Sequence, residues 1–593
     1  KVDIFESQSQ LGGQLNLEAN IPGKEDYRHT IRYFKYQLDK LGVKVHLNKS
    51  ATKKLLSKYQ EIVLASGALP RIPDIPGVHL PNVVNYADVL SAKVDVGQKV
   101  VIVGGGTAGW MTASLLIKVL GKSIDIELVE SDKIGIVGVG EASIPPIINF
   151  NQAIGVDERE FLKATKGTIK LGIEFNNWNK VGDSYMHAFG SIGKKFPFCD
   201  FHHFWLKHQL SKGDTSQVDN NSYWDYSLNY QTAKQNKFAR VNTIPNTNLP
   251  GLAYAYHFDA GLYAQFLRQH SEKQGVKRTE GIVSAVKQNP DNGFVTQLQM
   301  ENGQVIEGDL FIDCTGLAAL LIEKTLNTGY EDWSHWLPCN RAMAVPSENV
   351  GPTEPYTRST AHHVGWQWRI PLQHRTGNGL VYSDKHLTDD EAKDILLANI
   401  DGKPLAEPRV IPFRTGRRRK VWNKNVISVG LSSGFLEPLE STNIHLVQTA
   451  AIRLVRFFPH AGIAKEEVEE FNRLSRIESE GIRDFIILHY KLNSGKNSDF
   501  WRACQQMEIP ESLARKIALF KATGKIHNNP DDLFTDIAWQ QVMIGQGVVP
   551  KDYHALVDGL SDEQLKDLME SLDTLVTKTV EKLPSHDDFL KSL

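Results

Sequence analysis

The chain has 593 residues, and its 67 basic and 69 acidic side chains nearly cancel. This balance excludes a strong overall field that would draw the protein to nucleic acid or to an anionic membrane. No apolar run reaches the ~20 residues that span a bilayer, and the four widely spaced cysteines form no Cys-x-x-Cys pair. We therefore expect a globular protein of two or three structural units in the reducing cytoplasm, with no membrane and no nucleic-acid partner; the oligomeric state is unknown.

Residues 1–96 predict an incomplete α/β unit. A strand over 1–6 is followed by a helix over Tyr27–Leu41, a strand over Val43–Leu47 and a strand over Glu61–Leu64. This is the order of a dinucleotide-binding fold after its first strand, without the strand and glycine turn that hold the pyrophosphate. We expect that this unit does not bind its own flavin and that it ends in the stretches 70–77 and 95–97, which are rich in turn-forming residues.

A complete dinucleotide-binding unit is predicted from Gln98 onward. An apolar strand over 99–103 leads into the turn Gly104-x-Gly106-x-x-Gly109, a helix follows, and a second strand ends in Glu130, 21 residues after Gly109. Such a turn lets the backbone approach a pyrophosphate at a helix N-terminus, while the acid accepts hydrogen bonds from a ribose. The expected contacts are Gly104, Gly106, Thr107, Ala108, Gly109 and Glu130, and they do not by themselves distinguish FAD from NAD.

The rest of the chain adds strands to this sheet and then becomes helical. Short apolar runs ending in glycine at 309–316 and 425–430 are typical of later strands of the same sheet. Ser561 to Gln564 has the pattern of a capping box, followed by leucines at helical spacing that we interpret as ordinary core packing. We predict an α/β fold with three parts: 1–96, 97–450 and a mainly helical substrate-side region, 451–593.

Four segments, in order, resemble the FAD-dependent halogenases of the tryptophan halogenase family: 104–111 (GGGTAGWM), 138–145 (GVGEASIP), 365–371 (GWQWRIP) and 435–442 (FLEPLEST). The resemblance covers about residues 98–593 and implies a Rossmann-like FAD-binding domain of the flavin monooxygenase/halogenase type with a largely helical substrate-binding C-terminal part. It adds Gly140, Glu141, Ala142 and Gly430 to the expected FAD contacts. Residues 1–96 instead resemble dienoyl-CoA-reductase-type NADH:flavin oxidoreductases, in the segments 12–14 (GGQ), 21–25 (IPGKE) and 65–71 (ASGALPR).

The halogenase resemblance implies a reaction. Reduced FAD, supplied by a separate flavin reductase, reacts with oxygen and a halide to give hypohalous acid, which reaches a small aromatic substrate through an internal tunnel. The resemblance assigns the catalytic roles to Lys170 and Glu440. Indole or a simple indole derivative is expected rather than tryptophan, because the residues that grip the amino-acid part do not transfer to 489–501.

Other site residues follow from the same resemblance. Thr442 and Asn443 would bind the halide, with Asn443 replacing a glycine that is common in tryptophan-specific members. His187, Phe189 and Ser441 would bind substrate, since electron-rich rings stack on aromatic faces. Trp366 and Trp368 would form a barrier between substrate and flavin.

Several alternatives remain open. The substrate could be a phenol or pyrrole tethered to a carrier protein, the reaction could be flavin monooxygenation, and a self-reducing flavin-binding fusion centred on residues 1–96 is a non-enzymatic possibility. His202-His203 and His362-His363 lack partners at metal-binding spacing, so no metal is expected. Residues 417–420 (RRRK) are interpreted as a solvated loop, with a nicotinamide-phosphate site as the alternative.

Overall fold

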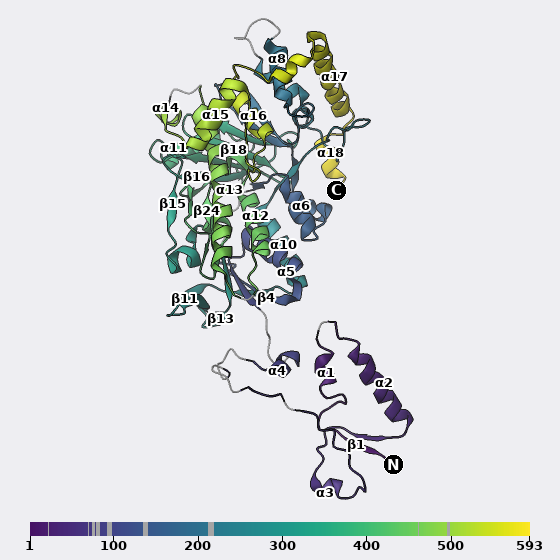
Figure 1. The fold of residues 1–593 in the computed structure, drawn as a ribbon. Coiled ribbons are helices and arrows are strands. Elements are labelled where there is room, and N and C mark those ends of the chain that lie inside the picture. Colours follow the sequence, from purple (N-terminus) through teal and green to yellow (C-terminus); the bar gives the residue numbers. More distant parts are fainter. Residues whose placement is uncertain are drawn as a thin grey trace. The chain divides into compact units, whose positions relative to one another are not determined.

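The protein is described by a computed structural model that places residues 1–593 except 22, 69, 74–77, 79–83, 92–97, 135–139, 211–218, 461 and 495–497. The chain divides into two compact units, Lys1–Gly97 and Gln98–Leu593 (Figure 1). Gly138 and Val139 of the second halogenase-like segment lie outside the described residues, as does most of the predicted exit from the first unit. The predicted subdivision at residue 450 stays a prediction.

The first unit is built around a two-stranded parallel sheet. β1 (Asp3–Phe5) pairs with β2 (Lys44–His46), and the helices are α1 (Leu15–Glu18), α2 (Tyr27–Lys40), α3 (Lys53–Leu56) and α4 (Tyr86–Leu90). The strand predicted over Glu61–Leu64 is wrong: the segment pairs with no described strand, and Val63 is 91% exposed. A strand needs a neighbour to accept its backbone hydrogen bonds, and the first strand of a dinucleotide fold would have been that neighbour.

The second unit contains a six-stranded sheet that matches the predicted Rossmann-like domain. Its order is β10 (Lys277–Glu280), β4 (Ile124–Glu130), β3 (Gln98–Val103), β14 (Leu310–Asp313), β23 (Val426–Ser428) and β22 (Trp422–Asn423), parallel except for β22. Both later strands predicted from the sequence, β14 and β23, lie in this sheet. The fold class is therefore confirmed.

The two faces of this sheet are buried by different elements, which explains the continuous apolar run of β3. Val100 and Ile102 face a core shared with α5 (Thr107–Leu120), whereas Val101 and Val103 face the core of the small sheet β11 (Val283–Gln288), β12 (Val295–Met300) and β13 (Val305–Glu307). α5 packs against α10 (Ala260–Gln274) and α12 (Asn443–Arg456). Strands buried on both faces read as unbroken apolar sequence.

A second, seven-stranded sheet carries the substrate-side part of the unit. Its order is β20 (Arg409–Pro412), β16 (Arg341–Ser347), β19 (Thr376–Tyr382), β18 (Trp366–Pro371), β17 (Thr357–Ala361), β7 (Gly172–Asn176) and β8 (Ser184–Ala188). A three-stranded sheet joins β5 (Glu141–Ala142), β9 (Ala255–Phe258) and β6 (Thr168–Lys170), and another joins β15 (Tyr330–Asp332), β21 (Gly416–Arg418) and β24 (Gly434–Phe435).

The C-terminal part is helical, as predicted, with α13 (Lys465–Leu492), α14 (Asp499–Gln506), α15 (Glu511–Thr523), α16 (Asp536–Gly545), α17 (Asp562–Glu581) and α18 (His586–Lys591). One core joins Phe175 of β7 and Tyr185 of β8 to Phe485 of α13 and Trp539 of α16, and α16 lies in the half of this unit that holds β16 and β18 (Figure 1). The predicted capping box of α17 is present. The remaining helices are α6 (Pro146–Ala153), α7 (Glu158–Ala164), α8 (Phe201–Leu210), α9 (Leu228–Lys234) and α11 (Asp389–Ala398).

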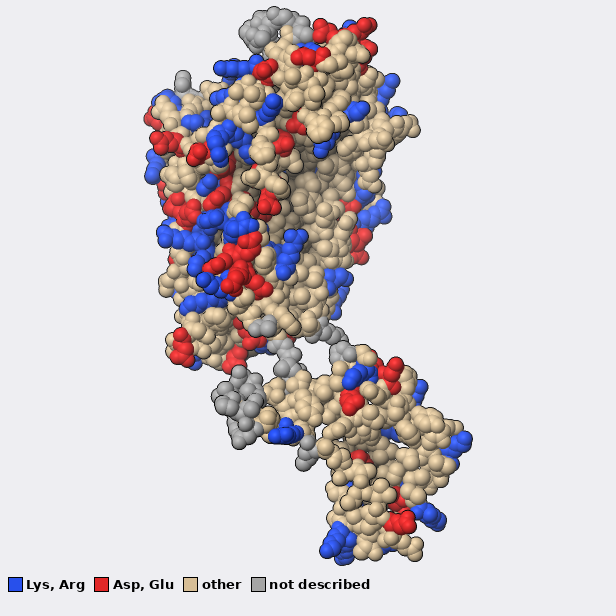
Figure 2. Space-filling model, viewed as in Figure 1, with Lys and Arg blue, Asp and Glu red and all other residues tan. Residues whose placement is uncertain are grey.

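The surface agrees with the balanced composition. Figure 2 shows basic and acidic side chains interspersed over the viewed face of the second unit. Residues 417–420 are not simply a solvated loop: Arg417 pairs with Glu331, and Arg418, only 8% exposed, pairs with Glu323. Among the described helices, none is both long and apolar enough to cross a lipid bilayer.

We predict that residues 98–593 fold without the first unit. Among the described apolar side chains of residues 1–97, only Ala19 is fully buried, so this unit has a minimal core of its own. A shortened chain of residues 98–593 should unfold cooperatively at the same Tm as the full chain, measured by circular dichroism. Loss of the cooperative transition would show instead that the first unit is required for the stability of the second.

Candidate active site

The glycine turn between β3 and α5 has a geometry that requires glycine. Gly104 has φ +112°, and a Cβ there would lie 2.2 Å from the carbonyl oxygen of Cys314. A Cβ on Gly109 would lie 1.9 Å from the carbonyl oxygen of Gly104. The turn therefore brings the N-terminus of α5, with its unpaired N–H groups, close to the end of β3, where an anionic group is stabilised.

Glu130 ends β4 beside this turn, as its spacing predicts. A Cβ on Gly105 would lie 1.4 Å from Oε2 of Glu130, so Gly105 makes room for the carboxylate. The Arg278 guanidinium donates to Oε1 of Glu130 at 2.6 Å and fixes that side of the carboxylate. Sequence analysis missed Arg278, since β10 pairs with β4 only after the chain has passed through a long intervening segment.

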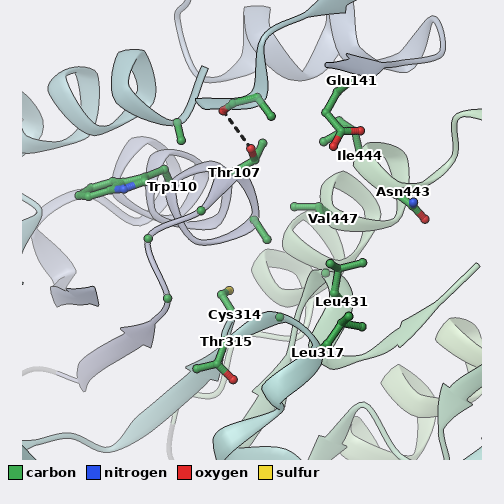
Figure 3. A pocket seen from close by; sticks show the side chains of 18 of the residues that line it. Thr107, Trp110, Glu141, Cys314, Thr315, Leu317, Leu431, Asn443, Ile444 and Val447 are labelled. Carbon is green, nitrogen blue, oxygen red and sulfur yellow. Dashed lines mark hydrogen bonds between the residues drawn. The ribbon is translucent and has the colours of Figure 1, made fainter. Parts of the chain in front are cut away.

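A cavity of about 850 Å³ opens over the turn. Of the residues predicted to bind FAD, all but Gly109 line it: Gly104, Gly106, Thr107, Ala108, Glu130, Gly140, Glu141, Ala142 and Gly430. In Figure 3, Thr107 and Trp110 stand on one side and Asn443, Ile444 and Val447 of α12 on the other, with the carboxylate of Glu141 directed toward the space between them. The glycine cradle, the carboxylate beyond it and the volume fit a flavin dinucleotide.

Glu141 is a part-buried acid of this cavity. Burial raises its pKa to about 7, and the nearby Asp259 carboxylate adds to the effect. Asp259 is itself held by Arg375 at 2.6 Å. A carboxyl group with a pKa close to neutrality can therefore face the bound cofactor either charged or neutral.

Lys170 ends β6 and is fully buried. Its Nζ donates to Oγ of Ser441 at 2.7 Å and lies 5.4 Å from the centre of the Phe189 ring. Burial lowers the pKa of Lys170 to about 7, and the negative charge of Glu440 only partly opposes this. The lysine can therefore change its charge near neutral pH, which few lysines do.

Glu440 lies in the same buried region and is bracketed by two histidines. Nδ1 of His187 is 2.7 Å from its Oε2, and Nε2 of His489 is 2.9 Å from its Oε1. Burial by itself raises the pKa of Glu440, but the two imidazoles outweigh it and lower that pKa to about 2. Glu440 is thus a carboxylate although its side chain is only 1% exposed.

Glu437, three residues earlier, is a different kind of acid. Its Oε2 accepts hydrogen bonds from Nε1 of Trp366 at 3.0 Å and from the hydroxyl of Tyr490 at 2.5 Å. Burial raises the pKa of Glu437 to about 7, and these two hydrogen bonds only moderate the rise. Its partners tie it to the protein core, which supports a structural role.

The two tryptophans of β18 hold different positions. Trp368 lines the cavity, whereas Trp366 does not and is fully buried against Glu437. Gly379 is opposite Trp368 on β19, and a Cβ there would lie 2.1 Å from the indole. The absence of a side chain at residue 379 therefore gives the Trp368 ring its place in the cavity wall.

The segment 438–441 separates the cavity from the buried charges. Pro438 and Ser441 line the cavity, but Lys170 and Glu440 do not. Ser441 has φ +58°, an uncommon left-handed conformation for serine, and precedes Thr442, the N-cap residue of α12. Ser441 therefore both lines the cavity and contacts Lys170.

Thr442 and Asn443 form the start of α12. Thr442 is fully buried and its Oγ1 has no hydrogen-bond partner among the described residues, while Asn443 lines the cavity. The first N–H groups of a helix have no intrahelical acceptor and favour an anion. This end of α12 therefore presents groups to the cavity that favour an anion.

Sequence reasoning also missed His489 and Gln541. The one sequence signal for His489 is a lone histidine in the apolar run 485–490, a segment that overlaps the region to which the family's amino-acid contacts do not transfer. Oε1 of Gln541 accepts from the Ala188 N–H at 3.0 Å, and its Nε2 donates to the Ala188 carbonyl at 3.0 Å. Gln541 thus holds the backbone between His187 and Phe189.

The histidine pairs considered as metal ligands have other partners. Nε2 of His202 lies 2.6 Å from the Gly524 carbonyl oxygen, and Nε2 of His362 lies 3.1 Å from Oε1 of Gln367. In the part of the chain that the structure describes, no three His, Cys, Asp or Glu side chains are grouped so that they could hold a metal ion.

Comparison with known proteins connects this geometry to a family. The family model of tryptophan halogenases matches residues 99–562. The chain belongs to the tryptophan halogenase family. The tryptophan 6-halogenase ThaL of Streptomyces albogriseolus is 32% identical over 538 residues, which cover 83% of this chain and 98% of that protein.

Solved structures agree with this assignment. Xcc4156, a flavin-dependent halogenase from Xanthomonas campestris, is 44% identical, with a TM-score of 0.80 over 84% of this chain and 98% of that one. BrvH, a flavin-dependent halogenase from Brevundimonas sp. BAL3, is 43% identical, with a TM-score of 0.80 over 84% of this chain and 99% of that one. This member of the family is a flavin-dependent halogenase.

The first unit matches a different family. The model of pyridine nucleotide-disulphide oxidoreductases covers residues 19–138, which include most of the first unit and continue through the glycine turn and β4 of the second. The predicted oxidoreductase-like N-terminal segment is confirmed.

For this halogenase we predict that Gln541→Leu disturbs the strand end that carries His187 and Phe189. The substitution leaves the Ala188 N–H and carbonyl buried without partners, which costs about 1–3 kcal/mol for each group, so Tm should fall by several degrees in a thermal melt. Gln540→Leu is the matched control: Gln540 is equally buried on α16 but bonds to Tyr223 and Asp200. If both variants unfold alike and both keep full affinity for the aromatic substrate, Gln541 has no specific role.

Proposed function

We propose that this halogenase uses reduced FAD from a separate flavin reductase, oxygen and a halide to produce hypohalous acid, which halogenates a free electron-rich aromatic compound. Indole or a simple indole derivative is the proposed substrate. The observation that carries the proposal is that Lys170 and Glu440 are buried together outside the flavin cavity, with Ser441 between the two regions. A diffusible oxidant, rather than direct contact between flavin and substrate, suits this separation.

The residues around the cavity support the first half of the reaction. FAD, when bound, supplies the oxidising chemistry that converts the halide. The proposed FAD contacts are Gly104, Gly106, Thr107, Ala108, Gly109, Glu130, Gly140, Glu141, Ala142 and Gly430. The halide binds at the N-terminus of α12, where Thr442 and Asn443 present N–H groups and the otherwise unpartnered Thr442 hydroxyl.

Lys170 and Glu440 act in the second half of the reaction, in which the halogen is transferred from hypohalous acid to the aromatic ring. The Lys170 ammonium donates a proton to the oxygen of hypohalous acid as the oxygen–halogen bond breaks, which gives water, while the halogen forms a bond to a ring carbon. The ring then loses its proton to the Glu440 carboxylate, and the C–H electron pair restores aromaticity. Return of this proton to Lys170 completes the balance, in which arene and hypohalous acid give haloarene and water.

The surroundings of His187 support an indole rather than an amino acid. The rings packed on His187 are those of Phe485 at 5.6 Å and Phe534 at 6.2 Å. Trp501 is fully buried and donates to the His362 carbonyl, so it contributes to the core. A flat apolar ring between His187 and Phe189 suits this environment, whereas a zwitterion needs charged partners.

Two alternatives are weaker. Flavin monooxygenation requires the substrate to approach the flavin, and the proposed barrier of Trp368 in the cavity wall with Trp366 behind it opposes that approach. Halogenation of a carrier-tethered phenol or pyrrole requires a docking surface, and no described feature points to one.

The central prediction concerns Lys170→Met. With reduced FAD, oxygen and bromide, the unaltered protein should add one bromine to indole, detected by mass spectrometry. Lys170→Met should brominate at least about a hundredfold more slowly, because it lacks the proton donor. FAD affinity and Tm should be unchanged or higher, since a buried charge has been removed. Retained bromination in this variant would rule out the assigned role.

The pH dependence tests the charge state of Lys170. Its pKa is lowered to about 7, so the ammonium form is present below that value and is lost as the pH rises through it. We expect kcat for bromination to fall above about pH 7, while reoxidation of reduced FAD, measured by absorbance, does not fall in parallel. A kcat that rises with pH would instead indicate that the neutral amine reacts, as in a haloamine route.

A further inference from the structure

His489 contacts two buried oxygen atoms, and these contacts bear on the protonation of its ring and of Glu440. It is fully buried on α13, with Nδ1 2.9 Å from the Phe485 carbonyl oxygen and Nε2 2.9 Å from Oε1 of Glu440. The ring is fixed between Phe175, at 4.7 Å, and Trp178, at 5.9 Å. Both ring nitrogens thus face oxygen atoms, and neither faces water.

The two oxygens constrain the imidazole differently. A carbonyl oxygen only accepts, so Nδ1 carries a proton. Nε2 lies 2.9 Å from a carboxyl oxygen but makes no aligned hydrogen bond with it, so this contact is an ion-pair contact. A positively charged ring is attracted to the carboxylate at this distance, whereas a neutral ring leaves the buried carboxylate oxygen uncompensated. If Glu440 is a carboxylate, the imidazolium is the form of His489 that stabilises it.

Oε1 of Glu440 lies next to His489. The other groups described around Glu440 contact its second oxygen or interact with it only through their charge. From β8, His187 faces the other oxygen, Oε2, at 2.7 Å, and Tyr185 also lies close enough to interact electrostatically. From β6, Lys170 interacts with Glu440 through its charge but donates its hydrogen bond to Ser441. The Tyr185 hydroxyl accepts from Gln546 at 3.1 Å.

We propose that His489 is a positioning residue for halogenation: its protonated imidazole holds Glu440 as a carboxylate and fixes Oε1, so that the acid remains able to take the proton that the aromatic ring loses. This inference rests on the proposed function and goes beyond it, since no part of the assignment from family resemblance involves His489. A buried carboxylate without this partner would gain a proton from solvent and lose its capacity to act as a base.

The first experiment measures the protonation state of the His489 ring directly and requires no flavin, halide or substrate. In the full chain with ¹⁵N-labelled histidine, the NMR shifts of both His489 nitrogens should be those of an imidazolium at neutral pH. His489→Gln identifies the signals by removing them. In Glu440→Gln, the Nε2 shift should move toward that of an unprotonated nitrogen, since a neutral amide no longer stabilises the cation. A neutral His489 in the unaltered protein overturns the proposal.

The second experiment follows kcat for indole bromination against pH in His489→Gln and His489→Phe. Phe removes both the charge and the polar contact with Glu440. The acid limb of the kcat profile, below which Glu440 is protonated, should therefore move to higher pH by about one to three units. Gln retains a neutral N–H donor and should move it less. Reoxidation of reduced FAD should be unaffected in both variants. A drop of equal size at every pH, with no movement of the limb, overturns the proposal.

His202→Gln is the matched control, because His202 is equally buried and has one ring nitrogen against a backbone carbonyl, yet does not contact Glu440. It should keep the acid limb of the unaltered protein. If neither the unaltered protein nor this control halogenates indole, the proposed function has failed, while the NMR result still decides the protonation of His489.

Discussion

The burial of Lys170 and Glu440 in one region is the constraint on which the site depends. Removing either charge from water is costly, and the protein offsets that cost with local partners: Ser441 for the ammonium, and His187 and His489 for the carboxylate. The result is a lysine whose pKa is lowered to about 7 beside an acid whose pKa is lowered to about 2. The environment of each group thus moves its pKa away from the ordinary value for that residue type.

The same segment that carries Glu440 also divides the unit into two chemical compartments. Pro438 and Ser441 contribute to the wall of the cavity over the glycine turn, whereas Glu440, between them in sequence, contacts His187 and His489 and does not line that cavity. The left-handed conformation of Ser441 allows α12 to begin at once, so the helix end that favours an anion lies next to the buried lysine. Strain of this kind is common where a structure must place several groups in one short segment.

The first unit shows what happens to an apolar segment when the strand that would pair with it is missing. β1 and β2 pair as they would in a dinucleotide-binding sheet, but the apolar segment 61–64 has no described strand beside it and remains exposed. The complete glycine turn of the second unit has its sheet, its helix and its acid in place. The second unit accordingly has the complete turn that a dinucleotide requires, whereas the described part of the first unit has an exposed apolar segment instead of a further strand.

The sequence by itself determined the dinucleotide fold and the family of the chain, because local patterns such as an apolar strand followed by Gly104-x-Gly106-x-x-Gly109 require a specific backbone path. It also suggested a strand over 61–64, where local propensity is not enough without a neighbour. Only the tertiary structure decided that Arg278 holds Glu130, that Gln541 holds Ala188 and that His489 compensates Glu440. These contacts join residues distant in sequence. Their energies come from burial, from single hydrogen bonds and from an ion-pair contact, none of which a sequence periodicity records.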